Sequence, residues 1–333
     1  MSVKIEDISK RLNISVSTVS KALNGYSDVS DVTRDLVLET AQSMGYHPSA
    51  AARNLRRGRT DKIGLLINNS IQFISEYLGE VISGLALEAE KEGHNIVLYT
   101  AVSSHQDVKR ICRNREVDGL IVVWSDVRDG TIELIHEENI PFVVFGRRVD
   151  DQRISYVSPD NYRGALDLTR HLIEEGHTRI AFTTRSELGI TNEDRFAGYC
   201  DGLKESGIPI EKDLIINTKI EPHSGYQAMQ ALLAHPRPPT ALFAIHDLLA
   251  ADALRAAQDA GLSIPDDIAI AGFDGLGPSL TSRPAITTVR QPLREMAQKA
   301  MTILFHSIEE KPLLPDRTTY PVTLIPRRST RTK

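Results

Sequence analysis

The pattern of apolar and polar positions predicts three short helices near the start of the chain. Residues Val3–Leu12 carry apolar side chains on one helical face, and after a break Ser15–Asn24 forms a second short helix. Ser30 is placed to cap a third helix, whose apolar stripe ends at Gly45 before Pro48. The first two elements therefore make a helix, a tight turn and a helix.

The next segment, residues 49–57, has helix-forming residues but almost no apolar face. A segment that can be helical but has nothing to bury is a linker, or a helix that forms only with a partner. Gly58-Arg59-Thr60 then separates it from the rest of the chain. We therefore expect a small helical unit, a linker, and a larger unit beyond residue 60.

From Ile63 onward, short apolar runs alternate with longer helical stretches. The predicted strands are Ile63–Asn68, Asn95–Thr100, Gly119–Trp124, Phe142–Gly146, Arg179–Thr184, Ala241–Ile245 and Ile268–Phe273. The predicted helices are Ser75–Glu92, Gln106–Arg115, Thr131–Glu138, Tyr162–Glu175, Arg195–Ser206, Ser224–Ala234, Asp247–Ala260 and Leu293–Glu309. Such alternation is typical of parallel sheets with helices on both faces. The predicted fold class is therefore α/β, with two Rossmann-like lobes that part near Ser158-Pro159-Asp160 and a ligand cleft at the carboxyl ends of their strands.

Length and composition are those of a soluble globular protein with two or three domains. The chain has 333 residues, of which 41% are hydrophobic and 25% charged. It has no apolar run of about 18 residues or more, and no basic and then apolar start, so we expect neither a membrane helix nor a signal peptide. The cysteines, Cys112 and Cys200, fit buried, inert thiols in a reducing cytosol.

The charge is divided unevenly between the two units. The whole chain carries −5, but residues 1–60 hold nine Lys and Arg against six Asp and Glu. A mildly basic head on an acidic body fits a specific DNA reader joined to a domain with another task. The second helix agrees, because Ser, Thr and Lys side chains suit phosphates and base edges in the major groove. The alternative is that these hydroxyls only cap the helix and face solvent.

Motifs of common catalytic and metal sites are missing from the sequence. There is no G-x-S-x-G elbow, no phosphate-binding loop and no H-E-x-x-H. The neighbours His246-Asp247 do not make a catalytic triad, and His171, His177 and His223 are too far apart in sequence to suggest a metal site. We therefore expect no enzyme activity, no cofactor and no metal.

Phrases spread along the whole chain resemble the LacI/GalR family of bacterial transcriptional regulators. The stretch Ser17–Gly25 is similar to the family's recognition helix, and Tyr46-His47-Pro48 followed by Ala51–Leu55 is similar to its hinge helix. The later phrases follow in the family's order: Phe145-Gly146-Arg147, Asp160-Asn161, Asp194–Gly198, Pro265–Ile268, Gly272-Phe273-Asp274 and Thr287–Pro292. Each phrase is weak alone, and their common order carries the resemblance.

The resemblance implies a repressor of the bacterial cytoplasm that binds a pseudo-palindromic operator as a homodimer and responds to a small effector. It implies a helix-turn-helix head over 1–48, a hinge helix and linker over 49–60, and an effector-binding and dimerisation core over 61–333, like the periplasmic sugar-binding proteins. The N-lobe of this core takes about 61–159 and 292–320, and the C-lobe about 160–291 and 321–333. No leucine-heptad tail follows Ser329, so a dimer is expected rather than a tetramer.

The resemblance also implies where DNA is contacted. Val16 and Ser17 hold the base-reading positions, and the expected contacts of the head are Ser15, Val16, Ser17, Thr18, Ser20, Lys21 and Asn24. In the hinge, Leu55 is expected to enter the minor groove, where a wedged side chain kinks DNA, or else to pack on the partner's hinge. The expected hinge contacts beside it are Ala51, Arg53, Arg56 and Arg57.

Arg195 and Asp274 are the central residues of the expected effector site. A guanidinium and a carboxylate can each make two hydrogen bonds to neighbouring hydroxyls of a sugar. Asp274 follows a predicted strand, where such lobes bind ligands, although it could instead cap a helix or form a structural salt bridge. Arg195 is predicted to open a helix, where the dipole disfavours a cation, which favours a binding role. The further candidates are Arg147, Gln291, Asp126 and His246, with Tyr77, Phe73 and Trp124 as stacking or core aromatic residues.

Two features depart from the family pattern. His246 stands where Asn is common, and its titratable ring selects a different effector or is a buried, satisfied residue. The segment Asn68–Ser75 is longer than usual and lacks the usual Asn-Pro-aromatic phrase. We expect a mono- or disaccharide effector, with a nucleobase or nucleoside as the alternative. A solute sensor without operator binding is the other alternative.

Overall fold

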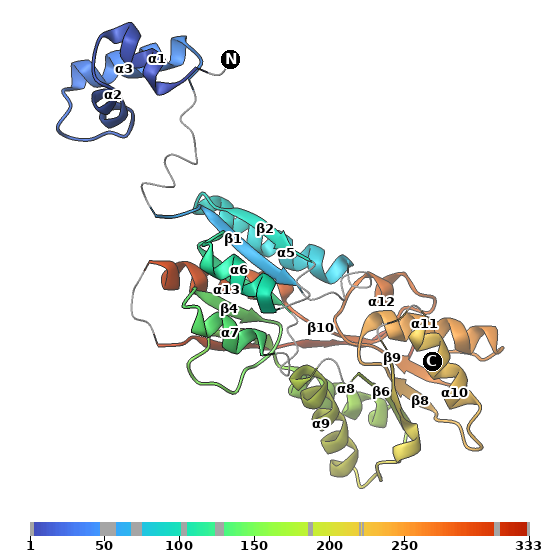
Figure 1. Ribbon diagram of the computed structural model, residues 1–333. Coiled ribbons are helices and arrows are strands. Elements are labelled where there is room, and N and C mark those ends of the chain that lie inside the picture. The colour runs from blue at the N-terminus through green and yellow to red at the C-terminus, as the bar shows by residue number, and fades with distance from the viewer. Residues whose placement is uncertain are drawn as a thin grey trace. The chain divides into compact units, whose positions relative to one another are not determined.

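The computed structural model describes residues 3–46, 58–67, 75–100, 105–123, 130–185, 189–219, 221, 223–309 and 314–331. The chain forms two compact units, Met1–Thr60 and Asp61–Lys333, which we call the head and the core (Figure 1). None of the described helices is both long enough and apolar enough to cross a membrane.

The head is a bundle of the three helices that the sequence predicts. They are α1 (Ile5–Leu12), α2 (Val16–Leu23) and α3 (Asp31–Ser43). Hydroxyl groups cap the second and third, because Ser15 accepts a hydrogen bond from the Thr18 N–H at 3.0 Å and Ser30 accepts one from the Thr33 N–H at 3.3 Å. Apolar side chains from all three helices meet in one small core: Ile8, Val19, Ala22, Val29, Val37 and Ala41.

The N-lobe of the core is built on a six-stranded parallel sheet with the order β11-β5-β4-β3-β1-β2. Its strands are β1 (Lys62–Ile67), β2 (Asn95–Tyr99), β3 (Gly119–Val123), β4 (Phe142–Phe145), β5 (Tyr156–Pro159) and β11 (Arg317–Tyr320). Its helices are α5 (Ser75–Lys91), α6 (His105–Arg113), α7 (Thr131–Glu137) and α13 (Leu293–Ile308). Alternate residues of β1 face opposite layers: Ile63 and Leu65 pack with α5 and α13, and Leu66 packs with α6 and α7.

The C-lobe is built on a four-stranded parallel sheet with the order β7-β6-β8-β9. Its strands are β6 (Ile180–Thr184), β7 (Ile215–Asn217), β8 (Ala241–Phe243) and β9 (Ala269–Ala271). Its helices are α8 (Asn161–Glu174), α9 (Ile190–Glu205), the short 3-10 helix η3 (Lys212–Leu214), α10 (Ser224–Leu233), α11 (Asp247–Asp259) and α12 (Gly277–Thr281). The rings of Phe182, Tyr199 and Phe243 pack together at the centre of this lobe.

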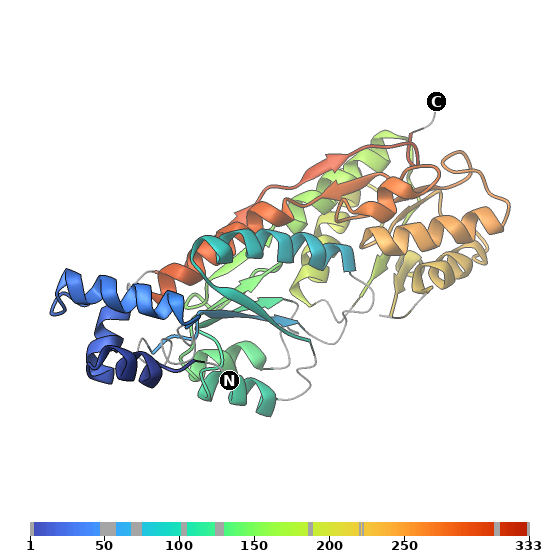
Figure 2. The same cartoon turned by 90° about the horizontal axis from the view of Figure 1, so that it is seen from above.

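The chain passes between the lobes after β5, after β10 (Thr288–Arg290) and after β11. Strand β10 pairs antiparallel with β12 (Thr323–Ile325). Because the chain returns to the N-lobe after β10, α13 lies there beside α5, although the two helices are far apart in sequence (Figure 2). The two lobes are therefore joined by several segments, and the carboxyl ends of strands from both lobes can meet between them.

The predicted α/β class and its parallel sheets are confirmed, with two kinds of difference. Strands β5, β7, β10, β11 and β12 were not predicted, because none of these short strands lies in an apolar run of about four residues or more, whereas the equally short β4, β8 and β9 do. The helix predicted to begin at Arg195 begins at Ile190, directly after Gly189. Arg195 therefore lies inside α9, and the argument that the dipole of a helix start disfavours it there is wrong.

Candidate functional site

The outer side of α2 carries three of the predicted DNA contacts. Val16 is 39% exposed, and Ser17 and Lys21 are exposed as well. Lys21 forms an ion pair with Asp28, and its hydrogen bond lowers the pKa of the Asp28 carboxyl. An exposed ion pair of this kind contributes little to stability.

The other predicted contacts of the head have partners within it. Ser15 and Thr18 share a hydrogen bond of 2.8 Å at the start of α2, and Asn24 donates its Nδ2–H to the carbonyl of Ser20 at 2.5 Å. Ser20 is only 5% exposed, because α2 packs against both α1 and α3. The structure therefore buries Ser20, which the resemblance implied to be a DNA contact.

Several predicted residues lie outside the described part of the chain. In the hinge these are Ala51, Arg53, Leu55, Arg56 and Arg57. In the core they are Phe73, Trp124 and Asp126. Their roles stay predictions.

Arg195 is the centre of a buried polar cluster in the C-lobe. Its Nε–H donates to Asn161 Oδ1 at 2.9 Å, its Nη2 to Asp274 Oδ1 at 3.3 Å, and its Nη1 to the carbonyl of Ile245. Its guanidinium also lies over the ring of Phe273, with Cζ 3.7 Å from the ring centroid. Because these partners come from different elements, the side chain is held in one position, with 4% of its surface exposed.

Asp274 faces Arg195 from the loop that follows β9. The Nε2–H of Gln291, which follows β10, donates to the same Oδ1 at 2.7 Å. The backbone φ of Asp274 is +114°, a value that residues other than glycine rarely adopt and that is typical of functional sites. Burial raises the pKa of the Asp274 carboxyl although Arg195 opposes this, and burial lowers the pKa of Arg195. Burial therefore opposes the charged form of both groups, and their mutual attraction opposes this effect.

Asp247 supports the loop that carries Asp274. It is the first residue of α11 and 1% exposed, and it accepts hydrogen bonds from the Thr288 hydroxyl at 2.5 Å and the Leu276 N–H at 2.7 Å. Burial and the neighbouring charge of Asp274 raise the pKa of its carboxyl. We infer that Asp247 fixes the position of Asp274.

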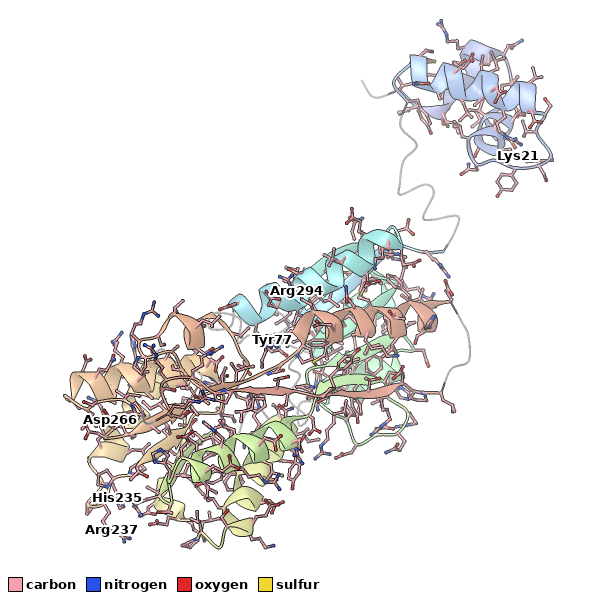
Figure 3. All side chains as sticks on the ribbon, turned by 180° about the vertical axis from the view of Figure 1, so that it is seen from behind. Lys21, Tyr77, His235, Arg237, Asp266 and Arg294 are labelled. Carbon is pink, nitrogen blue, oxygen red and sulfur yellow. The ribbon has the colours of Figure 1, made fainter. Side chains whose placement is uncertain are left out.

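Tyr77 brings the N-lobe to this cluster. It belongs to α5, is 5% exposed, and lies where the two lobes meet in Figure 3. Burial raises its pKa, and the charges of Asp274 and Arg195 both act on that pKa, which places the phenol near them. Its hydroxyl lies against Gly146, where a Cβ would be 3.0 Å from it, and buried Arg147 comes next in sequence. The structure therefore brings predicted residues of both lobes together.

His246 caps α11 and leaves one ring nitrogen without a partner. Its Nδ1 accepts a hydrogen bond from the Leu249 N–H at 3.2 Å, so in the neutral ring the proton is on Nε2. Burial and the charges of Arg185 and Arg195 hold its pKa well below the usual value, so the ring is neutral. Its buried Nε2–H has no hydrogen-bond partner in the part of the chain that the structure describes.

Two more buried polar atoms near Arg195 lack a hydrogen-bond partner among the described residues. Within the described residues, Nδ2 of Asn161 and Oε1 of Gln291 have no hydrogen-bond partner, although both residues touch the Arg195–Asp274 pair through their other polar atom. An unsatisfied buried polar group costs about 1–3 kcal/mol. Buried polar atoms that lack partners and lie near the carboxyl ends of strands are typical of a binding site for a polar ligand.

Asn161 and Arg185 belong to this region but were not predicted as site residues. Asn161 is the first residue of α8 and lies just beyond the end of β5, a strand that the sequence pattern did not reveal. Arg185 follows β6 and is 5% exposed, and its charge lowers the pKa of both His246 and Asp274. The position of Arg185 after a predicted strand was the signal that could have identified it.

Comparisons with known proteins agree with both units. A family model for bacterial regulatory proteins of the lacI family matches residues 4–49, and one for a periplasmic binding protein-like domain matches residues 169–330. The HTH-type transcriptional repressor PurR of Erwinia tasmaniensis is 33% identical over 330 residues, which cover 98% of this chain and 96% of that protein.

Solved structures are similar as well. The complex of the transcriptional regulator CelR with cellobiose is 26% identical, with a TM-score of 0.77, over 98% of this chain and 99% of that one. A LacI family transcriptional regulator from Enterococcus faecium with bound ribose is 27% identical, with a TM-score of 0.71, over 81% and 98% of the two chains. The chain therefore belongs to the lacI family of bacterial regulatory proteins, and it is a DNA-binding transcriptional repressor rather than an enzyme.

Proposed function

We propose that this repressor acts in the bacterial cytoplasm, binds a pseudo-palindromic operator as a homodimer, and is controlled by a mono- or disaccharide bound between its two lobes. The effector part rests on one observation, the buried polar atoms of His246, Asn161 and Gln291 that have no partner among the described residues. They lie around the Arg195–Asp274 pair. A ligand with several hydroxyls supplies the partners that they lack.

A sugar fits the chemistry of these groups. Its hydroxyls donate and accept hydrogen bonds, and here His246 Nε2–H and Asn161 Nδ2–H are donors while Gln291 Oε1 is an acceptor. A neutral ligand also adds no further charge to a buried ion pair. The solved regulators with bound cellobiose and bound ribose, both similar to this chain, give independent support for a saccharide.

A ligand at this position lies beside residues of both lobes. Tyr77 comes from the N-lobe, whereas Arg195 and Asp274 come from the C-lobe. The lobes also touch nearby, because the Gly277 N–H donates to Glu76 Oε1 at 2.7 Å. A ligand that binds one arrangement of the lobes more tightly shifts the protein toward that arrangement. In a dimer, such a shift changes the spacing of the two heads and hence the affinity for the operator.

The DNA-binding part rests on the exposed side of α2. Val16, Ser17 and Lys21 lie there, and Lys21 has only an exposed ion pair to exchange for a phosphate. A helix that presents a short apolar side chain, a hydroxyl and an ammonium suits the major groove. This surface favours a working repressor over a solute sensor that no longer binds DNA.

Calorimetric titration of the full-length protein with a panel of mono- and disaccharides tests the effector. We expect one of them to bind, and Asp274→Asn to weaken that binding about tenfold to hundredfold, the effect of losing hydrogen bonds to a charged group. Asp266→Asn is the matched control, because exposed Asp266 lies at the end of the C-lobe away from Tyr77 (Figure 3). If a nucleobase or nucleoside binds and no sugar does, the alternative effector class replaces the sugar.

A gel-shift assay tests the repressor itself, with an operator selected from random DNA. Asp274→Asn should bind that operator as the wild type does and should respond to the effector only at concentrations about tenfold to hundredfold higher. An unchanged dose–response curve would remove Asp274 from the effector site. If no sequence binds more tightly than random DNA at physiological salt, the operator proposal fails.

A further inference from the structure

Three potential metal ligands meet at the edge of the N-lobe sheet where its strands begin. Asp61, His94 and Asp118 each directly precede a strand, namely β1, β2 and β3, and these strands are neighbours with β1 in the middle. One ligand atom of each residue lies within 4.8 Å of those of the other two. This edge carries the amino ends of the strands, whereas the effector cluster follows the carboxyl ends of strands.

The backbone holds the three residues in register. The Asn95 N–H donates to the Asp61 carbonyl at 2.9 Å, and the Asp118 N–H donates to the Lys62 carbonyl at 2.8 Å. The Asp61 N–H in turn donates to Asp118 Oδ2 at 2.8 Å. Because the ladder of a parallel sheet fixes these positions, the backbone itself places the three residues close together.

His94 has the arrangement of a metal ligand. Its Nδ1 lies 2.9 Å from the carbonyl of Glu92, so Nδ1 carries a proton, and in the singly protonated ring Nε2 is the nitrogen available to a metal. A histidine that binds a metal usually donates its other N–H in this way. The side chain is 9% exposed, with its ring 5.0 Å from that of Phe305 between centroids. Its Nε2 is buried and has no hydrogen-bond partner among the described residues.

The lone pair of Nε2 faces a carboxylate. Asp118 Oδ2 lies 3.5 Å away, and the Asp118 side chain is only 7% exposed. With Nε2 unprotonated, its lone pair and the negative oxygen repel each other, and a cation between them, either a proton or a metal ion, removes this repulsion. A tetrahedral metal site with bonds of about 2.0–2.2 Å places its donors about 3.3–3.6 Å apart, so this separation suits a shared metal ion.

We propose that Asp61, His94 and Asp118 form a binding site for a divalent transition-metal ion of the Zn²⁺ class, with water as a further ligand. One imidazole nitrogen and two carboxylates are ligands that such ions accept, and the two carboxylates balance the charge of the ion. Asp61 is partly exposed and can turn its carboxylate toward the ion. The ion then ties the first residue of the core, which directly follows the linker, to three strands of the N-lobe.

Metal competition on the full-length, chelator-treated protein tests the site, with Zn²⁺ and a coloured chelator as the probe. Asp61→Asn is the sharpest variant, because Asp61 has φ +52° and Asn tolerates this backbone conformation. His94→Phe is the second, since it keeps a ring against Phe305. His306→Gln is the control, because His306 is exposed on α13.

We expect one Zn²⁺ per chain that outcompetes the chelator, with each ligand variant losing about tenfold or more in affinity, and the control unchanged. The absorption bands of bound Co²⁺ should show nitrogen and oxygen coordination and should disappear in both ligand variants. Equal Zn²⁺ affinity in wild type and variants would overturn the proposal. So would an absence of binding in the wild type, which would leave a protonated His94 beside Asp118 as an ion pair only.

Discussion

Arg148, which follows β4 in the N-lobe, donates its Nε–H to both carboxylate oxygens of Asp194 in the C-lobe, at 3.0 and 3.1 Å. Asp194 and Arg195 are neighbours in α9. One turn of this helix therefore carries both a contact between the lobes and the centre of the polar cluster. A movement of α9 on ligand binding would therefore displace Asp194 and change its contact with Arg148.

A double-mutant cycle measures this contact. Arg148 is 41% exposed at its side chain, so we expect Arg148→Gln and Asp194→Asn to have a coupling energy of about 0.2–1 kcal/mol in the free energy of unfolding. Urea unfolding of the two single variants and the double variant gives this value. Strictly additive effects would show that the ion pair does not hold the lobes together.

Helix packing in the C-lobe gives a sharper stability prediction. A Cβ on Gly198 would lie 2.4 Å from the carbonyl oxygen of Tyr162 and 2.8 Å from the backbone nitrogen of Leu166, where α9 meets α8. Neither backbone atom can move away easily, so Gly198→Ala should lower the free energy of unfolding by about 1–3 kcal/mol. Urea unfolding followed by circular dichroism measures the loss.

Gly79 provides the matched control, because it lies in α5 and a Cβ there meets nothing within 4 Å. Alanine in an open helical position stabilises by about 0.5–1 kcal/mol relative to glycine. Gly79→Ala should therefore act in the opposite direction to Gly198→Ala. Equal effects of the two substitutions would contradict the close approach of α8 and α9.

The sequence predicts strands that lie in continuous apolar runs and misses short strands that do not. Strands β1 and β3 have five or six residues, nearly all buried, and their apolar runs are unmistakable. Strand β10 has three residues, and β5 includes Ser158 and Pro159, which suggest a break rather than a strand. A pattern needs several residues before its period can be recognised, so such strands emerge only from pairing with their neighbours.

The same limit applies to the sites. Asp274 was predicted because it follows a recognisable strand, whereas Asn161 follows β5 and was therefore missed. The group Asp61, His94 and Asp118 could not be predicted from spacing, because whole strands and helices separate its members. It exists because the register of β1 with β2 and β3 aligns the residues that precede them. The sequence predicts the three strands that these residues precede, but not that the strands are neighbours in the sheet, so it does not reveal that the residues meet.

Protonation of His246 gives a pH-dependent prediction. Burial and the charges of Arg185 and Arg195 hold its pKa in the folded protein well below 6.5, its usual value. As the pH falls below about 6.5, the unfolded chain gains this proton first, so the folded state loses stability at about 1.4 kcal/mol per pH unit until the folded pKa is reached. His246→Asn keeps a side chain that caps a helix and removes the titration.

Urea unfolding at several values between pH 7 and pH 5 measures this effect. The His171 and His177 pKa values are also lowered by burial, so part of the loss should remain in His246→Asn. The variant should nevertheless show a shallower decline than the wild type. Parallel declines in wild type and His246→Asn would mean that the ring is not buried in its neutral form.

Two serines of the head separate a role in folding from a role in DNA binding. Ser15 accepts the Thr18 N–H at 3.0 Å and caps α2, whereas Ser17 is exposed on the outer side of the same helix. Ser15→Ala should therefore cost about 1 kcal/mol in the stability of the head. Ser17→Ala should change that stability by less than about 0.5 kcal/mol and should weaken binding to the selected operator about fivefold or more, the effect of one lost base contact.

Thermal unfolding and fluorescence anisotropy with labelled operator measure the two effects on the full-length protein. If Ser17→Ala binds the operator as tightly as the wild type, the outer side of α2 does not read the DNA through this hydroxyl, and Val16 and Lys21 must carry the recognition.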